Sequence, residues 1–322
     1  MSEVLEQTKR LREIWGGFRQ ARVLLTANNY RIFDHLIRPR SARAVSRELN
    51  TDLRATGILL DALTGLGLLR KRNGMYSNSP IANKFLVSGS PYYQGDILRH
   101  ADILWKNWSG LDEVLKTGKP YHKWHDQQAF ILGMHNLAVL KAGGVLRNIG
   151  LKGVKTALDL GGGPGTYSIE MAKRGIKVTL FDRSETIKIA KKVIQDAGYR
   201  IEDLVSYIEG DFLEDDLGGG YDLILISQVL HAYSEGDIIH VLRRCKRALN
   251  KGGRVVIQEF YISNDLTHPL QSALFSVNML VNTEGGRCYS PVEIKDWFRR
   301  IGLKGIREVY FDDSVLIEGV MK

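Results

Sequence analysis

The sequence is poor in cysteine and contains no long hydrophobic run. Only Cys245 and Cys288 occur in 322 residues, which is too few for a disulfide framework or a cysteine-based zinc cluster. No apolar run approaches the roughly 18 residues that a membrane-spanning helix needs, and the first residues carry no apolar segment typical of a signal peptide. We therefore expect a cytoplasmic protein without disulfides, without a metal site and without a membrane contact.

Acidic residues are scarce in the first quarter of the chain. Residues 1–90 contain 15 lysines and arginines but only 7 aspartates and glutamates, so they carry nearly all of the net charge of +9. This asymmetry indicates two modules, and the length also predicts about two domains. A basic module raises nucleic acid as a partner, although a solvated basic surface explains the charge more simply.

The first 90 residues are expected to form a winged helix. A helix over residues 4–35 precedes a short helix that Ser41 can cap, and Thr51 or Asp52 can cap the next one. Asn73-Gly74 lies between two short extended runs, which predicts a hairpin. The helix before the hairpin has few side chains that read base edges, so we expect no nucleic-acid binding. One helical face gathers apolar residues that indicate contact with another chain: Leu11, Ile14, Trp15 and Phe18.

The remainder of the chain predicts an α/β domain. Residues 91–150 are expected to form a helical linker, and from about residue 151 short apolar strands alternate with helices. This alternation is typical of a parallel sheet covered by helices on both faces. The last two strands have no helix between them, which predicts an antiparallel closing hairpin. The seven expected strands are Thr156–Leu160, Ile176–Phe181, Val205–Glu209, Asp222–Ile226, Arg254–Phe260, Lys304–Phe311 and Ser314–Met321.

A glycine-rich loop, from Gly161 through Gly163 to Gly165, follows the first of these strands. Glycines let a ligand approach the backbone closely, and the next helix offers free N–H groups at its start. Asp182 ends the second strand 21 residues after Gly161, where a carboxylate accepts hydrogen bonds from ribose hydroxyls. The pattern predicts a nucleoside site.

NAD and S-adenosylmethionine (SAM) both contain a nucleoside, and three features favour SAM. Thr166 stands where the strict dinucleotide motif needs its third glycine. Asp159 can hold the ammonium group of SAM but would repel a pyrophosphate. Asp211 and Phe212 end the third strand and offer a carboxylate to the adenine amino group and a ring to pack on it.

These residues, with the front module and the closing hairpin, resemble the SAM-dependent O-methyltransferase family, which includes plant caffeic-acid methyltransferases and bacterial polyketide and hydroxyneurosporene methyltransferases. The resemblance covers nearly the whole chain. It implies a Rossmann-like class I methyltransferase domain at 151–322, a winged-helix dimerisation domain at 1–90, and a linker at 91–150 that contributes to the substrate pocket. It therefore also implies a homodimer.

The resemblance assigns roles to individual residues. His231 is the implied general base, and Glu259 matches an acid that flanks it. Asn278 and Asn282 lie on the helix along which the acceptor pocket of the family extends. Besides Asp159 and Gly163, which the loop itself indicates, the implied SAM contacts are Gly161, Asp182, Asp211, Phe212 and Ser227.

The sequence departs from the family pattern at two places. Ala232-Tyr233 follows His231, where the family commonly has Asp-Trp, and Cys288 stands where a second flanking acid is common. These departures leave open methyl transfer to sulfur or carbon, or a SAM-assisted reaction without transfer. His122 and His125 have a metal-ligand-like spacing, but they lie in a polar stretch in which we expect no metal.

The expected chemistry is O-methyl transfer to a small hydroxylated metabolite, aromatic or polyketide-like. The enzyme must hold the acceptor oxygen about 3 Å from the methyl carbon, and a phenol must also lose its proton. An imidazole with a pKa near 6.5 is a suitable base at neutral pH, and a carboxylate on its other nitrogen fixes the tautomer. The alternative from a different class is a SAM-responsive winged-helix regulator that binds DNA.

Overall fold

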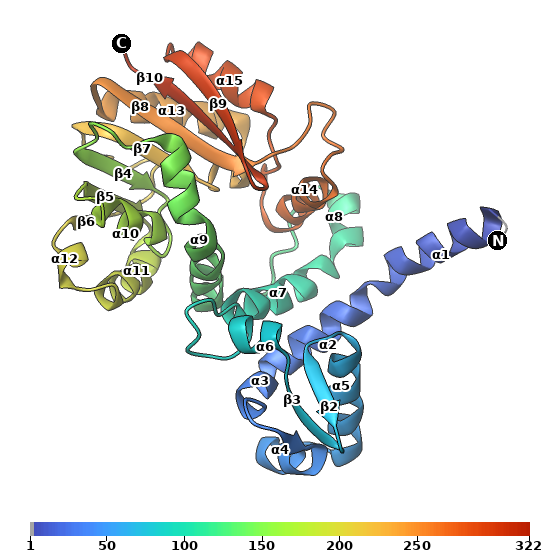
Figure 1. The fold of residues 1–322 in the computed structure, drawn as a ribbon. Coiled ribbons are helices and arrows are strands. Elements are labelled where there is room, and N and C mark those ends of the chain that lie inside the picture. The colour runs from blue at the N-terminus through green and yellow to red at the C-terminus, as the bar shows by residue number, and fades with distance from the viewer. Residues whose placement is uncertain (1–2) are drawn as a thin grey trace. The chain divides into compact units, whose positions relative to one another are not determined.

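The computed structural model describes residues 3–322 apart from the side chain of Tyr199. Contacts within the chain define two compact units, the first ending at Asp102 and the second beginning at Ile103. Helix α7 (Gly95–Trp108) contains this boundary (Figure 1). Each unit has its own hydrophobic core, and each is described by itself below.

The first unit begins with three helices where we expected one helix over residues 4–35, so that expectation was wrong. Helix α1 ends at Gly16, and Gly17 separates it from α2, because glycine is a poor helix former. Arg31 has a left-handed backbone with φ of 51°, which ends the second helical stretch. The helices of this unit are α1 (Glu3–Gly16), α2 (Phe18–Asn29), α3 (Ile32–His35), α4 (Ala42–Leu49), α5 (Leu53–Gly65) and α6 (Pro80–Phe85).

The helix, turn, helix and hairpin expected after residue 40 are present. The Ser41 hydroxyl accepts a hydrogen bond from the Ala44 N–H at 3.2 Å, and Asp52 caps the next helix through the Ala55 N–H at 2.7 Å. Asn73 and Gly74 have φ of 50° and 75°, which a tight hairpin turn of the primed type requires. The strands β2 (Leu69–Arg72) and β3 (Met75–Asn78) pair antiparallel, and β1 (Arg40–Ser41) adds a third strand that we did not expect.

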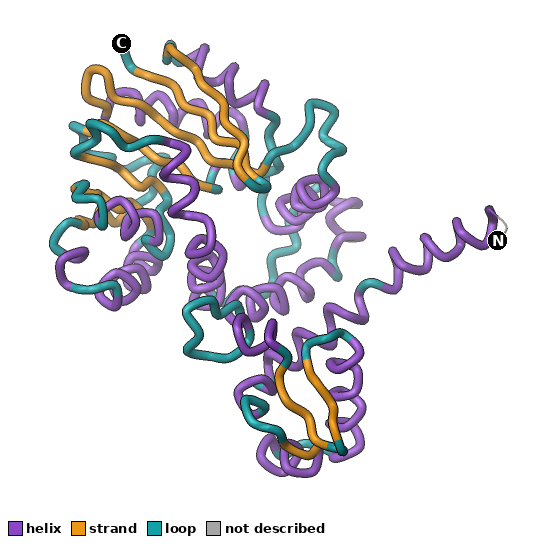
Figure 2. The backbone as a smooth tube through the Cα atoms, viewed as in Figure 1, coloured by secondary structure: helices purple, strands orange, loops and turns teal. Residues whose placement is uncertain are grey.

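The second unit contains a seven-stranded sheet in the order β6-β5-β4-β7-β8-β10-β9. The first five are parallel, and β10 is antiparallel to both β8 and β9, which confirms the expected strands and closing hairpin. Figure 2 shows the strands as one twisted sheet with helices beside it. The strands are β4 (Thr156–Leu160), β5 (Lys177–Asp182), β6 (Val205–Glu209), β7 (Tyr221–Ser227), β8 (Leu249–Phe260), β9 (Lys304–Phe311) and β10 (Ser314–Val320).

Helices cover both faces of this sheet because its strands are apolar on both sides. Along β7, Ile224 and Ile226 pack in one core cluster with helices α13 and α15, whereas Leu223 and Leu225 pack in another with α9, α10 and α11. The helices of this unit are α8 (Leu111–Thr117), α9 (Gln127–Ile149), α10 (Thr166–Ala172), α11 (Ser184–Asp196), α12 (Tyr199–Glu202), the 3₁₀ turn η1 (Leu230–Ala232), α13 (Glu235–Ala248), α14 (Leu270–Asn282) and α15 (Pro291–Arg300).

Helix α9 corrects the expectation that no segment is long and apolar enough for a membrane span. Its 23 residues meet that test by length and composition, although a core helix meets the same test. Ala142, Val145, Leu146 and Ile149 are buried in the core cluster that contains α10 and α11. The apolar character of α9 is therefore explained by its packing against the sheet domain.

Candidate active site

The sequence-predicted residues gather where the parallel strands end. Asp159 lies near the end of β4 and the glycine loop follows that strand, Asp182 ends β5, and Ser227 ends β7. His231 lies in η1 just beyond β7, and Glu259 lies near the end of β8. Ligands of open α/β sheets bind beyond the carboxyl ends of their strands, so this edge is the candidate site.

The glycine loop is folded tightly against its surroundings. Gly161 and Gly163 have φ of 65° and 54°, which side-chain-bearing residues rarely adopt. A Cβ atom at Gly161 would lie 2.8 Å from a methyl group of Val229, two residues before His231. The loop after β4 is thus in contact with the segment that carries the candidate base.

Asp182 is tied directly to the glycine loop. One carboxylate oxygen accepts a hydrogen bond from the Gly163 N–H at 2.8 Å, and the other accepts from the Arg183 N–H at 2.8 Å. Burial raises the pKa of Asp182, while these N–H groups and the Thr186 hydroxyl act in the opposite direction. The carboxylate keeps further lone pairs, which is what binding to ribose hydroxyls needs.

Asp159 lies beneath the loop and is buried. The hydroxyl of Ser168, in the first turn of α10, donates to its carboxylate at 2.7 Å. Burial raises the pKa of Asp159 to about 6. Its charge therefore changes just below neutral pH, and an ammonium group nearby would favour the ionised form.

Asp211 and Phe212 follow β6, but their surroundings differ. Asp211 forms an ion pair with Arg183 at 3.3 Å and also accepts the Leu213 N–H at 2.9 Å. The ring of Phe212 is buried, with its centroid 5.2 Å from that of Tyr233. Tyr233, which stands where the family commonly has tryptophan, thus packs on the ring that we expected to face adenine.

His231 and Glu259 form a close polar pair at the candidate site. The Nδ1 atom of His231 lies 2.8 Å from one Glu259 oxygen, and the His231 backbone N–H donates to the other at 3.2 Å. Glu259 is only 2% exposed. A carboxylate fixed on Nδ1 holds the proton there and leaves Nε2 to accept a proton.

Aromatic rings and a thiol surround this pair. Phe275 on α14 meets the His231 ring edge-on with centroids 4.8 Å apart, and Phe260 lies 6.0 Å away. Cys288 is buried, and burial raises the pKa of its thiol to about 11, so the thiol is neutral at physiological pH. Cys288 therefore supplies no second negative charge beside His231.

Sequence reasoning missed a polar cluster at the ends of β7 and β8. The Ser227 hydroxyl donates to the Gln258 side chain at 2.9 Å, and both side chains lie near the Tyr167 hydroxyl, whose pKa burial raises and these two groups lower. Ser227 was expected as a SAM contact, and its hydroxyl also contacts Gln258 on β8. The sequence signal that could have indicated this cluster was the position of Tyr167, two residues after Gly165 in the first turn of α10.

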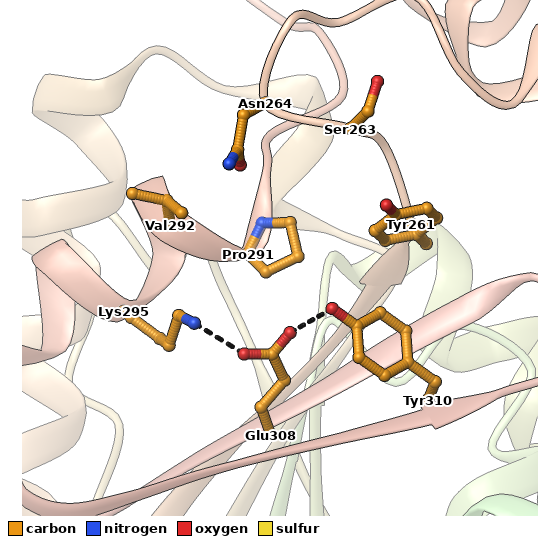
Figure 3. A pocket seen from close by; sticks show the side chains of 8 residues that line it. All are labelled: Tyr261, Ser263, Asn264, Pro291, Val292, Lys295, Glu308 and Tyr310. Atoms are coloured by element: carbon orange, nitrogen blue, oxygen red, sulfur yellow. Dashed lines mark hydrogen bonds and ion pairs between the residues drawn. The ribbon is translucent and has the colours of Figure 1, made fainter.

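A surface hollow of about 350 Å³ lies away from these residues (Figure 3). It is lined from the loop after β8, from α15 and from β9, and none of the expected site residues lines it. Lys295 pairs with Glu308 at 2.6 Å, and Tyr310 bonds to the same carboxylate. Because its charged groups already satisfy one another, we assign no ligand to it.

His122 and His125 lie close together in the segment before α9. Their rings lie 5.4 Å apart, and each bonds to an amide side chain. Across residues 3–322, no group of three or more histidine, cysteine or acidic side chains is placed to hold a metal ion. The arrangement at the strand ends thus offers a nucleoside site, a carboxylate–imidazole pair and an aromatic wall.

Comparisons with known proteins agree with this geometry. Residues 13–88 match the model of an O-methyltransferase dimerisation domain, and residues 94–304 match that of an O-methyltransferase domain. A 3-hydroxy-5-methyl-1-naphthoate 3-O-methyltransferase from Streptomyces sahachiroi is 31% identical over 84% of this chain and 81% of its own. The acetylserotonin O-methyltransferase of Bos taurus is 30% identical over 92% of both chains. The crystal structure of human N-acetylserotonin methyltransferase with SAM has a TM-score of 0.89 and 25% identity, and covers 100% of this chain and 99% of that one.

Proposed function

The chain belongs to the SAM-dependent O-methyltransferases, and from this premise we propose that it methylates a hydroxyl group of a small aromatic or polyketide-like metabolite with His231 as the general base. The single observation that supports the base is the 2.8 Å contact between His231 Nδ1 and the buried Glu259. The methyl donor in this family is SAM. Two observations support an aromatic acceptor. Phe260 and Phe275 form an aromatic wall beside His231, and the relatives are named as methyltransferases of a naphthoate and of acetylserotonin.

The reaction needs three contributions from the chain. The residues at the ends of β4, β5 and β6 hold SAM, with Asp182 on the ribose and Asp159 on the ammonium side. The aromatic wall holds the acceptor ring so that its oxygen faces the methyl group. His231 Nε2 then takes the hydroxyl proton as the oxygen attacks the methyl carbon, and the sulfonium leaves as a neutral thioether. Glu259 stabilises the imidazolium that results.

Incubation with methyl-labelled SAM and a panel of phenols tests this proposal. The panel includes hydroxynaphthoates, N-acetylserotonin and hydroxylated polyketides. Label in an ether product supports O-methyl transfer. Label found only in a thioether or in a carbon–carbon product would contradict O-methyl transfer and indicate methyl transfer to sulfur or to carbon.

SAM affinity is expected to rise about tenfold between pH 5 and pH 7. Because burial raises the pKa of Asp159 to about 6, this group is mostly protonated at the lower pH and ionised at the higher one. Only the carboxylate attracts the ammonium group. Without SAM the free energy of unfolding falls over the same window, since the folded state keeps a proton that the unfolded chain has released. Calorimetric titrations measure the affinity, and an Asp159→Asn variant with the same pH dependence would contradict this role.

We also propose that the protein is a homodimer that the first unit assembles. The matching dimerisation model and the exposed stripe of Leu11, Ile14, Trp15 and Phe18 support this. No residue of α1 is buried within the chain, and the large apolar side chains of Trp15 and Ile14 are 53% and 70% exposed. Such a face gains stability by covering its apolar surface with a second copy.

Ile14→Glu is expected to convert the dimer to a monomer at micromolar concentration, since it places a charge in the apolar stripe. Lys9→Glu, which changes charge on the opposite side of α1, is the matched control and should remain dimeric. Light scattering measures both masses. A wild-type protein that is monomeric at micromolar concentration would refute the proposal.

A further inference from the structure

The segment 121–127 connects the two halves of the site, although the mechanism above does not use it. It comprises the end of the connection between α8 and α9 together with the first residue of α9, and it includes the His122 and His125 pair. Asp126 caps α9 through the Ala129 N–H at 2.9 Å. Its polar contacts lead to the ribose carboxylate on one side and to helix α14 on the other.

The contact toward the cofactor runs through Gln127. Its amide nitrogen donates to the Thr186 hydroxyl at 3.0 Å, and its amide oxygen lies 2.8 Å from His125 Nε2. Thr186 is 3% exposed, and its hydroxyl lies near the Asp182 carboxylate, whose pKa burial raises and this hydroxyl lowers. A hydroxyl has one proton, so a donor at the Thr186 oxygen directs that proton toward Asp182.

The contacts toward the acceptor side run through the end of α14. The Tyr121 N–H donates to the Val281 carbonyl at 2.8 Å, and His122 Nδ1 lies 3.2 Å from the Asn282 side-chain oxygen. Asn107, which is fully buried, donates to that same oxygen at 3.0 Å. Asn107 also exchanges two hydrogen bonds with the backbone of Trp124 at 3.0 and 3.1 Å.

Helix α14 carries these contacts to the candidate base. Asn282 donates to the Asn278 side chain at 3.1 Å, and Trp108 Nε1 donates to the same Asn278 oxygen at 2.8 Å. Phe275, one turn earlier, is the ring that meets His231 edge-on. Because a helix moves as a stiff rod, a shift of its last turn also moves Phe275 against the base.

We propose that Gln127 is a positioning residue that couples SAM binding to the acceptor wall. SAM bound at Asp182 holds Thr186 and Gln127 in place, and the segment 121–127 then holds the last turn of α14. The acceptor wall is therefore more ordered with SAM bound than without it, so SAM binds before the acceptor. This inference rests on the placement of the SAM ribose at Asp182.

Hydrogen–deuterium exchange of the full-length protein with and without saturating SAM tests the coupling. In the wild type, SAM is expected to slow exchange about threefold or more in peptides that cover 119–127 and 278–284. Gln127→Leu removes both side-chain hydrogen bonds at nearly constant size. In this variant the slowing is expected to disappear, and SAM is expected to bind with an affinity about fivefold lower than in the wild type. Exchange without SAM stays close to that of the wild type. Gln128→Leu, the same change at the exposed neighbouring residue, is the matched control and keeps the slowing.

Two results would overturn the coupling: wild-type protein that binds SAM without slower exchange in either peptide, or Gln127→Leu with the full wild-type slowing. His125→Ala provides a second variant at an exposed position, and it should lose the slowing in 119–127 even where Gln127→Leu fails to fold. Calorimetry separates these results from failure of the cofactor site. A wild type that binds SAM while Asp182→Ala keeps full affinity would refute the ribose placement itself.

Discussion

Replacement of His231 with alanine is expected to lower the rate of methyl transfer in a single turnover by about 10²–10⁴-fold. Glu259 lies 2.8 Å from His231 Nδ1, so in the proposed mechanism Nε2 is the nitrogen that takes the proton of the acceptor hydroxyl. Alanine removes this base and leaves the residues around the glycine loop in place. SAM affinity should therefore be nearly unchanged. Rapid-quench measurement with labelled SAM gives the rate, and calorimetry gives the affinity.

The acidity of the acceptor provides the control for this prediction. A phenol with a pKa near 10 needs a base at neutral pH, whereas a nitrophenol with a pKa near 7 is already partly ionised. The rate defect of His231→Ala should therefore shrink along a series of increasingly acidic phenols. A defect of constant size along the series would show that His231 positions the acceptor but does not accept its proton.

Glu259→Gln is expected to slow transfer less than His231→Ala. The imidazole remains in this variant, but it loses the carboxylate that fixes its tautomer and stabilises the imidazolium. Cys288 cannot compensate, since burial raises its thiol pKa to about 11 and keeps it uncharged. If His231→Ala retains full turnover on its true acceptor, deprotonation does not depend on this histidine. The acceptor is then a thiolate, an acidic hydroxyl or a carbon centre.

The sheet domain could be predicted from the sequence because its strands are short, apolar and separated by helices. All seven strands were placed within a few residues, except that β8 begins at Leu249, five residues before the expected Arg254. The sequence Asn250-Lys-Gly-Gly contains turn-forming residues, which concealed the start of that strand. The N-terminal helix was predicted too long, because its apolar periodicity continues past Gly17, where α1 has ended and α2 begins.

The site was predictable where function depends on the type of residue at a strand end. Asp182 next to Gly163 and His231 next to Glu259 are pairs of this kind, and the parallel order of the strands brings them together. The contacts of Gln127, Asn107 and Tyr167 were not predictable. Each of these side chains interacts with a residue distant in sequence, and an amide or a hydroxyl in isolation does not indicate its partner.

Replacement of Asp182 with alanine is expected to weaken SAM binding by roughly 10- to 150-fold, which corresponds to the loss of about 1.5–3 kcal/mol from a charge-assisted hydrogen bond. The carboxylate lies at the end of β5 and also accepts the N–H of Gly163 at 2.8 Å. The variant thus loses the proposed ribose ligand and one anchor of the glycine loop. Calorimetric titration with SAM measures the change, and Asp196→Ala at the exposed end of α11 is the matched control.

The two contributions of Asp182 can be separated with a ligand that lacks the ribose hydroxyls. For a 2′,3′-dideoxy analogue of S-adenosylhomocysteine, Asp182→Ala should lose only the part of the binding affinity that comes from the glycine loop, because the analogue offers no hydroxyl to the carboxylate. The affinity ratio between wild type and variant is therefore expected to be smaller for the analogue than for S-adenosylhomocysteine. Equal ratios for both ligands would show that Asp182 acts through Gly163 alone. Wild-type SAM affinity in the variant would remove Asp182 from the cofactor site altogether.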